Sequence, residues 1–397
     1  MLLSLGILLL VGFLAGEVFR KLKLPPLVGM LLTGIFLGPY VLNVLDGDLL
    51  SISADLRKIA LIVILARAGL NLDLADLKKV GRPALLLCFL PATFEIVGMT
   101  IFAPMILNIT TLQAMVLGTV VAAVSPAVIV PTMLKIMEEG YGTDQSIPQM
   151  LLAGASVDDV FVIVLFTSFT GLAKTGTFSA IGLLQIPTAI VLGVLGGVLL
   201  GYILAKIFKR FPMEDMAKLL LTLAGAFFLV SVEAHATGII GFSGLLAIMA
   251  MGITMKKIHD GVALTLSRTY GKIWFIAQIL LFALVGAEVD VRYAMESGLT
   301  VVLLLALVLV TRMMGVYCCT LYTKLNKKER LFSMIAYTPK ATVQAAIGGI
   351  PLAMGLPGGK TILTVAVVSI LLTAPLGAFA IDRMYKKCLR KGKSLLS

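Results

Sequence analysis

Charged residues are scarce in this chain. They make up 14% of its 397 residues, whereas soluble domains carry about 25%. Apolar residues reach 59%, which is more than a soluble domain can bury, so the chain needs lipid as its solvent. A spanning helix takes about 20 apolar residues, and the length therefore allows about a dozen spans with short loops. No stretch is left for a soluble receptor or catalytic domain.

Cysteine and histidine are also rare, with four and two residues. The cysteines lack the spacing of metal ligands or of a disulfide framework, and no HExxH, GxSxG or other nucleophile–base pair occurs. The net charge is +12, but the basic residues flank apolar runs, which is typical of a membrane topology signal and not of a nucleic-acid surface. We therefore expect a membrane protein that is not an enzyme, binds no nucleic acid and needs no cofactor.

Apolar runs bounded by charge, proline and glycine predict an all-α membrane protein with about 13 transmembrane helices. If the amino end lies outside, most of the 33 basic residues fall in inner loops and in the tail, as the positive-inside rule requires. We expect a multi-pass protein of the inner (plasma) membrane with its carboxyl end in the cytoplasm. The expected spans are 2–19, 26–45, 52–70, 83–107, 112–137, 148–173, 180–208, 217–235, 239–256, 264–287, 298–322, 331–353 and 360–382.

Two of these spans are interrupted by proline in the same way. The span 112–137 contains VVAAVSPAVIVPTMLKIM, with Pro126 and Pro131, and the span 331–353 contains MIAYTPKATVQAAIGG, with Pro339. Proline removes a backbone donor and clashes with the preceding turn. Both spans are fifth in a unit of six helices, and the single linking helix between the units inverts the second one. The pattern predicts two inverted six-helix repeats with two proline-broken crossing helices, as in secondary transporters.

The adjacent acids Asp158 and Asp159 lie in LLAGASVDDVFVIVLFTSF, between apolar runs of about ten residues. A charge at mid-membrane costs about 2.5–3.5 kcal/mol on insertion scales. A purely structural role therefore does not readily explain two adjacent acids. A pair solvated at a helix end is the alternative. Carboxylates are hard oxygen ligands suited to Na⁺ or Li⁺, and the loss of water favours their protonated form. The pair can therefore hold a metal ion and a proton in turn.

Other polar residues lie inside or beside the predicted spans. Glu95 and Arg312 are in the middle of equivalent helices and are expected to pair, with a structural and a functional role both open. Lys340 and Thr338 lie at the second proline break, where Lys340 is expected to compensate partial charges at helix ends more than to contact the ion. Ser125 lies at the first break and is expected to offer a hydroxyl or carbonyl oxygen to the cation.

Five segments in this order resemble the cation/proton antiporter superfamily, and in particular its NHA-type sodium/proton exchanger branch. They are ILARAGLNLD, VSPAVIVPTML, GYGTDQSIPQMLLAGASVDD, LLFALVGAEVD and YTPKATVQAAIG. The resemblance implies a single transmembrane domain over 1–397, with an ion-translocating core at about 83–173 and 298–385. It further implies a dimerisation scaffold at about 1–70 and 180–287, homodimers, and elevator-like movement of the core.

The resemblance also implies roles for individual residues. Asp159 matches the essential ion-binding carboxylate, with Asp158 as its partner, so Na⁺ is expected at this pair. Arg312 stands where electrogenic bacterial relatives have a lysine, and in the NHA branch it resembles a partner for the glutamate that matches Glu95. Arginine effectively cannot lose its proton. We therefore expect electroneutral exchange of Na⁺ (or Li⁺) for H⁺.

Four other functions remain open from the sequence. The chain could exchange K⁺ for H⁺, or it could take up an organic solute with sodium through a related fold. A channel can also use proline-broken helices, but it would conduct without proton coupling. An intramembrane enzyme would need a nucleophile–base pair.

Overall fold

The computed structural model describes residues 1–22, 24–72, 81–175, 180–235, 241–292 and 298–392. Within these ranges the regular structure is helical, apart from one antiparallel bridge between Tyr141 and Lys391. The chain divides into two compact units. Unit 1 consists of Met1–Ala54, Ala75–Val162 and Leu281–Ser397, and unit 2 consists of Asp55–Leu74 and Ile163–Leu280.

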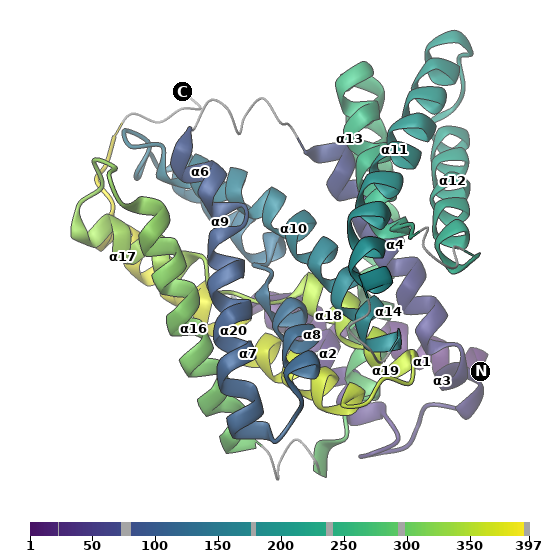
Figure 1. Cartoon of the computed structure of the whole chain (residues 1–397), viewed down its shortest axis with the longest axis horizontal. Coiled ribbons are helices and arrows are strands. Elements are labelled where there is room, and N and C mark those ends of the chain that lie inside the picture. Colours follow the sequence, from purple (N-terminus) through teal and green to yellow (C-terminus); the bar gives the residue numbers. More distant parts are fainter. Residues whose placement is uncertain (23, 73–80, 176–179, 236–240, 293–297, 393–397) are drawn as a thin grey trace. The chain divides into compact units, whose positions relative to one another are not determined.

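Long apolar helices make up most of the chain (Figure 1). Eight helical spans in the described part of the chain are long and apolar enough to cross a bilayer. A helix suits lipid because it satisfies its backbone polar groups internally. The helices of these spans are α1 (Leu2–Lys21), α6 and α7 (Arg82–Leu87 and Leu90–Leu107), α10 (Ile147–Thr175), α11 (Ala180–Arg210), α12 (Asp215–His235), α14 (Asp260–Ala287), α16 (Gly298–Thr320) and α20 (Gly359–Cys388).

The all-helical membrane fold predicted from the sequence is confirmed, while the number of 13 crossings and the inverted repeat stay predictions. Other helices are α2 (Pro26–Leu37), α3 (Gly47–Ser51), α4 (Ser53–Asn71), α8 (Thr111–Ala122), α9 (Pro126–Glu138), α13 (Gly244–Ile258), α17 (Lys327–Ala336), α18 (Thr342–Gly348) and α19 (Ile350–Ala353).

Two helical runs of unit 1 are interrupted where the sequence predicted it. In the span 112–137, α8 ends at Ala122 and α9 begins at Pro126, whereas Pro131 lies inside α9 and does not interrupt it. Between α17 and α18 the chain is not helical, and Pro339 lies in this gap. The backbone N–H of Ser125 donates to the carbonyl of Pro339 at 2.8 Å. The two interruptions therefore touch, and the prediction of two proline-broken crossing helices is confirmed.

Some predicted helix boundaries are wrong. The helix expected over 26–45 ends at Leu37, because Gly38 is extended and a proline follows it. The helix expected over 83–107 is interrupted between α6 and α7. Pro91 has no N–H for the carbonyl of Leu87, four residues earlier, and that carbonyl instead accepts a bond from the hydroxyl of Tyr337 at 3.1 Å. The start of the helix expected over 239–256 lies outside the described residues, and its described part is α13.

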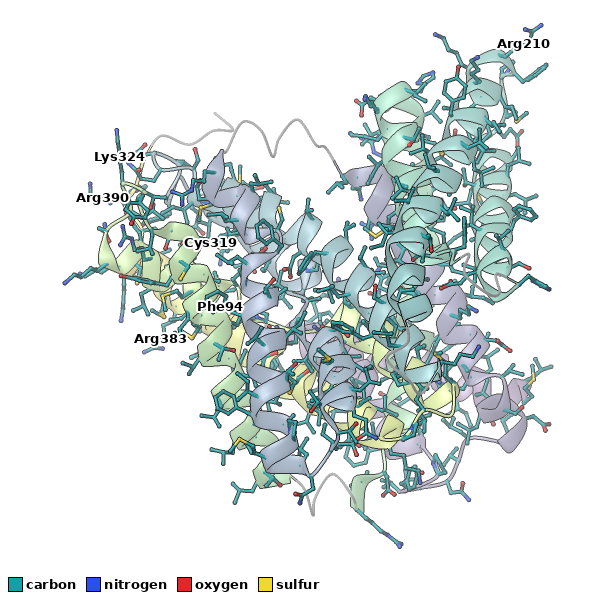
Figure 2. The ribbon with its side chains drawn as sticks, viewed as in Figure 1. Phe94, Arg210, Cys319, Lys324, Arg383 and Arg390 are labelled. Atoms are coloured by element: carbon teal, nitrogen blue, oxygen red, sulfur yellow. The ribbon has the colours of Figure 1, made fainter. Side chains whose placement is uncertain are left out.

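Within unit 1, α7 packs against both α8 and α16. The contact with α16 is close because a glycine faces α7 there: a β-carbon on Gly315 would lie 2.7 Å from the α-carbon of Pro91. Small residues of this kind let membrane helices approach each other closely. Figure 2 shows Phe94 on α7, and its β-carbon lies beside Gly315. This packing brings Glu95 of α7 to Arg312 of α16.

The segment after α20 pairs with the loop between α9 and α10, also in unit 1. The N–H of Gly142 donates to the carbonyl of Arg390 at 2.8 Å, and the N–H of Gly392 donates to the carbonyl of Gly140 at 2.7 Å. Basic side chains gather at this end of the unit, among them Lys324 and Arg390 (Figure 2). The loop that leads into α10 is therefore hydrogen-bonded to the segment that follows α20.

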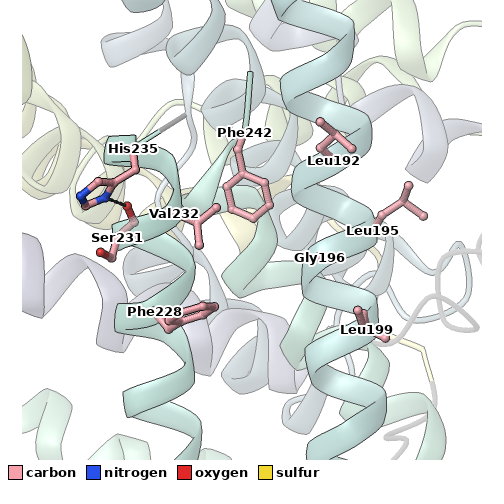
Figure 3. A pocket seen from close by; sticks show the side chains of 9 residues that line it. All are labelled: Leu192, Leu195, Gly196, Leu199, Phe228, Ser231, Val232, His235 and Phe242. Atoms are coloured by element: carbon pink, nitrogen blue, oxygen red, sulfur yellow. Dashed lines mark hydrogen bonds between the residues drawn. The ribbon is translucent and has the colours of Figure 1, made fainter. Parts of the chain in front are cut away.

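Unit 2 contains a close contact between two helices and an apolar groove. α11 packs along α13 through Gly193, Gly197 and Gly201, which follow one another at four-residue spacing. A groove of about 620 Å³ lies between α11 and α12 (Figure 3). Its described lining holds no acidic side chain, so it offers no carboxylate to a cation. The lining residues are Leu192, Leu195, Gly196, Leu199, Phe228, Ser231, Val232, His235 and Phe242.

Candidate functional site

The aspartate pair lies on α10, in the part of this helix that belongs to unit 1. Asp158 is fully buried and Asp159 is 8% exposed, which is not the environment of a solvated helix end. Oδ2 of Asp158 accepts a bond from the N–H of Val124 at 2.8 Å and one from the guanidinium of Arg312 at 3.2 Å. Among the described residues, neither Oδ1 of Asp158 nor Oδ1 of Asp159 has a hydrogen-bond partner. The pair thus combines a tethered carboxylate with oxygens that remain open to a cation or a proton.

Ser125 lies in the first helix interruption, one residue after the amide that holds Asp158. Its carbonyl accepts bonds from the N–H groups of Val128 and Ile129 at 3.2 and 3.1 Å, as expected of an N-cap residue. Its hydroxyl is buried and has no partner in the part of the chain that the structure describes. The sequence predicted that either the carbonyl or the hydroxyl of Ser125 contacts the cation. Of these two oxygens, the hydroxyl is the one without a hydrogen bond among the described residues.

Glu95 and Arg312 are both fully buried, and the structure brings them together. Nη1 of Arg312 donates to Oε2 of Glu95 at 2.7 Å. The same guanidinium also donates to the carbonyls of Ala122 and Tyr337, the latter at 2.6 Å, and its carbon lies 5.1 Å from the centre of the Tyr337 ring. These two carbonyls belong to the carboxyl ends of α8 and α17, where backbone oxygens lack helical partners. Arg312 therefore joins two acids and two helix ends.

Lys340 lies in the second interruption and is fully buried. Its ammonium group donates to Oε2 of Glu95 at 2.6 Å and to the carbonyl of Ala122 at 3.4 Å, and its backbone N–H donates to Oγ1 of Thr373 at 2.9 Å. The sequence predicted contact with helix ends, which the Ala122 carbonyl represents, and it missed the ion pair with Glu95. Thr338 lies two residues after the end of α17, and its hydroxyl donates to the carbonyl of Ile335 in that helix at 2.8 Å.

The charged residues Glu95, Asp158, Asp159, Arg312 and Lys340 are called the cluster below. Two further residues lie beside this cluster, and the sequence had not singled them out. Tyr337 is fully buried between Arg312 and the carbonyl of Leu87. Gln344 is fully buried on α18 and forms hydrogen bonds with the backbone of Ala341, beside α18, and of Val121 in α8. Both belong to the second proline-interrupted segment, so the interruption itself was the only signal that could have pointed to them.

The charges in this cluster do not balance. Three carboxylates, on Glu95, Asp158 and Asp159, face two cations, on Arg312 and Lys340, all within unit 1 and all buried. With every group ionised, one negative charge is in excess. An uncompensated charge in a low-dielectric interior is costly, and one bound monovalent cation or one proton removes it. The described residues hold no group of three histidine, cysteine or acidic side chains that could keep a resident metal ion.

Interrupted helices that cross beside buried carboxylates, in a chain of apolar spans, define a class of protein: a secondary transporter of small cations. The pattern of the family described as "Sodium/hydrogen exchanger, transmembrane" matches residues 6–387, and the chain belongs to this family. The membership in the cation/proton antiporter superfamily that the sequence suggested is confirmed.

Relatives share most of the length of the chain. Sodium/hydrogen exchanger 9B1 of Homo sapiens is 32% identical over 98% of this chain and 78% of its own length. Sodium/hydrogen exchanger 9B2 is 34% identical in Homo sapiens, over 93% of this chain and 70% of the relative, and 34% identical in Xenopus tropicalis, over 98% and 75%. The sodium proton antiporter MjNhaP1 from Methanocaldococcus jannaschii has a similar fold, with a TM-score of 0.82 over 97% of both chains at 22% identity.

Proposed function

We propose that this chain exchanges Na⁺ (or Li⁺) for H⁺ at Asp159, with Asp158 and Ser125 completing the cation site. The proposal is carried by buried oxygens on these three side chains that have no hydrogen-bond partner among the described residues, next to a cluster with one negative charge in excess. Carboxylate and hydroxyl oxygens are suitable ligands for a hard monovalent cation. Membership in the sodium/hydrogen exchanger family supports Na⁺ and H⁺ as the exchanged ions.

Coupling follows from competition for the same charge. A cation and a proton neutralise the same excess charge, so the site holds one or the other. An empty, ionised site carries an uncompensated charge, and a charge at mid-membrane costs about 2.5–3.5 kcal/mol, or about two orders of magnitude in rate. Movement of the empty site is therefore disfavoured, and transport in one direction requires return of the other ion.

Glu95, Arg312 and Lys340 act in this proposal as the fixed part of the cluster. Arg312 and Lys340 hold Glu95 and the ends of the broken helices, and Thr338 bonds within the end of α17. Because arginine keeps its proton, Arg312 is not a proton carrier. The loaded cluster is neutral with either Na⁺ or H⁺ bound, and exchange of one for one moves no net charge. We therefore propose electroneutral exchange.

Alternating access is proposed to proceed by elevator-like movement of a core, formed by about 83–173 and 298–385, against a scaffold formed by about 1–70 and 180–287. We propose that the scaffold forms a homodimer in the inner (plasma) membrane, with the amino end outside and the carboxyl end in the cytoplasm. The distribution of basic residues among the loops supports this orientation. No chemical reaction and no cofactor is part of the proposal.

The test is proton movement in proteoliposomes that report internal pH. A pH gradient is imposed, and Na⁺, Li⁺, K⁺ or choline is added outside. We expect Na⁺ and Li⁺ to shift the internal pH, Asp159→Asn to abolish the shift, and Asp382→Asn to preserve it. Asp382 is a matched control because it is an exposed acid on α20 that pairs with Lys135 at 2.7 Å.

The other outcomes each exclude part of the proposal. A response that survives Asp159→Asn removes this residue from the mechanism. A response to K⁺ with none to Na⁺ makes the protein a K⁺/H⁺ exchanger. Absence of any cation response, with vesicles shown to be sealed, refutes cation/proton exchange and favours a solute transporter.

A further inference from the structure

The uncharged side chain of a glutamine lies where the two interrupted helices touch, beside the charged cluster. Gln344 is fully buried in the first turn of α18. Its Oε1 accepts a bond from the N–H of Ala341 at 2.8 Å, and its Nε2 donates to the carbonyls of Val121 at 3.0 Å and Ala123 at 2.6 Å. Ala341 belongs to the second interruption, while the two carbonyls belong to the end of α8. One side chain therefore bonds to both broken helices.

This chemistry matches what the two helix ends lack. The carboxyl end of α8 presents carbonyls with partial negative charge, and the amino end of α18 presents N–H groups with partial positive charge. A carboxamide has two donors and an acceptor, so it satisfies both ends. An ammonium or guanidinium group could bond only to the carbonyls, and an ionised carboxylate only to the N–H. Gln344 also leaves the charge excess of the cluster at one.

The backbone that Gln344 holds is the backbone that anchors the cation site. Val124 directly follows Ala123, and its N–H is the donor to Asp158 at 2.8 Å. Ser125 is the next residue, and its buried hydroxyl has no partner in the ranges that the structure describes. A displacement of the Ala123 carbonyl therefore moves the anchor of one aspartate and the open hydroxyl together.

We propose that Gln344 is a positioning residue of the cation site. Its carboxamide fixes the backbone over residues 121–125 and thereby sets the affinity for the transported cation, although the hydrogen bonds of its amide go to backbone atoms and not to the aspartates. This inference rests on the proposed function of the aspartate pair. In enzymes a misplacement of about 1 Å can cost about 100-fold in rate, and we expect a loss of similar size in cation affinity here.

The first test compares Gln344→Met with Gln113→Met. Methionine keeps the length of glutamine without its hydrogen bonds. Gln113 is a matched control because it also bonds to α8 backbone, but at the amino end, where it forms a capping box with Thr110. In proteoliposomes we expect Gln344→Met to raise the apparent KM for Na⁺ by roughly 10- to 100-fold, with a smaller change in maximal rate. We expect Gln113→Met to stay within about twofold of the unsubstituted protein.

Hydrogen exchange provides a readout that needs no transport. Peptides that cover residues 117–127 should exchange faster in Gln344→Met and remain protected in Gln113→Met. An unchanged KM, or unchanged protection of this segment, overturns the positioning role. If the unsubstituted protein moves no protons with any cation, the proposed function fails. The hydrogen-exchange measurement still decides in that case whether Gln344 holds the backbone at the end of α8.

Gln344→Glu serves where the methionine variant does not fold. A protonated glutamic acid has one donor and an acceptor, so it can replace part of the carboxamide, whereas the ionised form has no donor and adds a second excess charge. The KM for Na⁺ of this variant, divided by that of the unsubstituted protein at the same pH, should therefore fall as the pH is lowered. A ratio that is constant between pH 6 and pH 9 contradicts the proposal, because a side chain that only fills space would not respond to pH.

Discussion

The replacement Arg312→Lys tests the fixed cation of the cluster most directly. The guanidinium donates to four partners: one oxygen each of Glu95 and Asp158, and the carbonyls of Ala122 and Tyr337. An ammonium group has three donors, so at least one buried partner loses its bond. An unsatisfied buried acceptor costs about 1–3 kcal/mol, and we expect a lower melting temperature in detergent.

The replacement should also change the number of charges that each transport cycle moves across the membrane. A buried lysine can lose its proton, whereas arginine effectively cannot. If Lys at position 312 releases a proton when Na⁺ binds, each cycle moves two protons for one Na⁺ and therefore one net charge. One elementary charge across 100 mV corresponds to about 2.3 kcal/mol. The variant should then sustain a Na⁺ gradient that changes about 50-fold per 100 mV, because 1.4 kcal/mol corresponds to a factor of ten.

The assay sets a membrane potential across proteoliposomes with valinomycin and a K⁺ gradient, after K⁺ itself has been tested as a substrate. We expect Na⁺/H⁺ exchange by the unsubstituted protein to ignore the potential and exchange by Arg312→Lys to follow it. Arg330→Lys is the control, because this arginine lies on α17 and bonds to the carbonyl of Thr323. Voltage dependence in the unsubstituted protein would refute the argument from charge balance. An Arg312→Lys variant that ignores the potential would refute the argument that the arginine replaces a proton carrier.

Two further predictions concern the open hydroxyl and the end of α20. Ser125→Ala should raise the apparent KM for Na⁺ several-fold. Ser369→Ala should leave the KM unchanged, because it removes a buried hydroxyl that already donates to the carbonyl of Ala366 at 2.7 Å. Equal effects of the two replacements would exclude a ligand role for Ser125. The Tyr385 hydroxyl, which donates to Glu139 at 2.7 Å, and the nearby Lys386 ammonium lower the pKa of Glu139. A lowered pKa stabilises the folded protein above the ordinary glutamate pKa of about 4.3, and this contribution is lost as the pH falls through the lowered value. The difference in melting temperature between the unsubstituted protein and Glu139→Gln should therefore shrink below about pH 4; a difference that grows on acidification would contradict this assignment.

The features that the sequence predicted well depend on local chemistry. Pro126 begins a new helix and Pro339 lies between two helices, as expected of a ring that has no N–H to donate, whereas Pro104, Pro131 and Pro375 lie inside continuous helices. The acids of α10 had to be buried because long apolar runs flank them. The contact between Glu95 and Arg312 could be expected because each is a lone charge in the middle of a span, and a lone charge needs a partner.

The features that the sequence did not reveal depend on contacts between distant segments. Gln344 stands in an ordinary apolar helix sequence, and nothing local distinguishes a glutamine that bonds to α8 from one that fills space. The ion pair of Lys340 with Glu95 joins residues 245 positions apart. The interruption before α7 was missed because Pro91 lies inside a long apolar run, and the Leu87 carbonyl that it leaves without a helical partner accepts a bond from the distant Tyr337.

The end of α8 also bears on how the protein is made. The carbonyls of Val121, Ala122 and Ala123 accept their side-chain hydrogen bonds from residues that follow 190 to 223 positions later in the chain. At about 5–20 residues per second, the ribosome reaches those residues about 10–45 s after it has made α8. Hydrocarbon offers no partner to a free carbonyl, so this segment has to wait beside water or the insertion machinery. The end of α8 can therefore reach its final hydrogen bonding only after residues 312–344 have been synthesised.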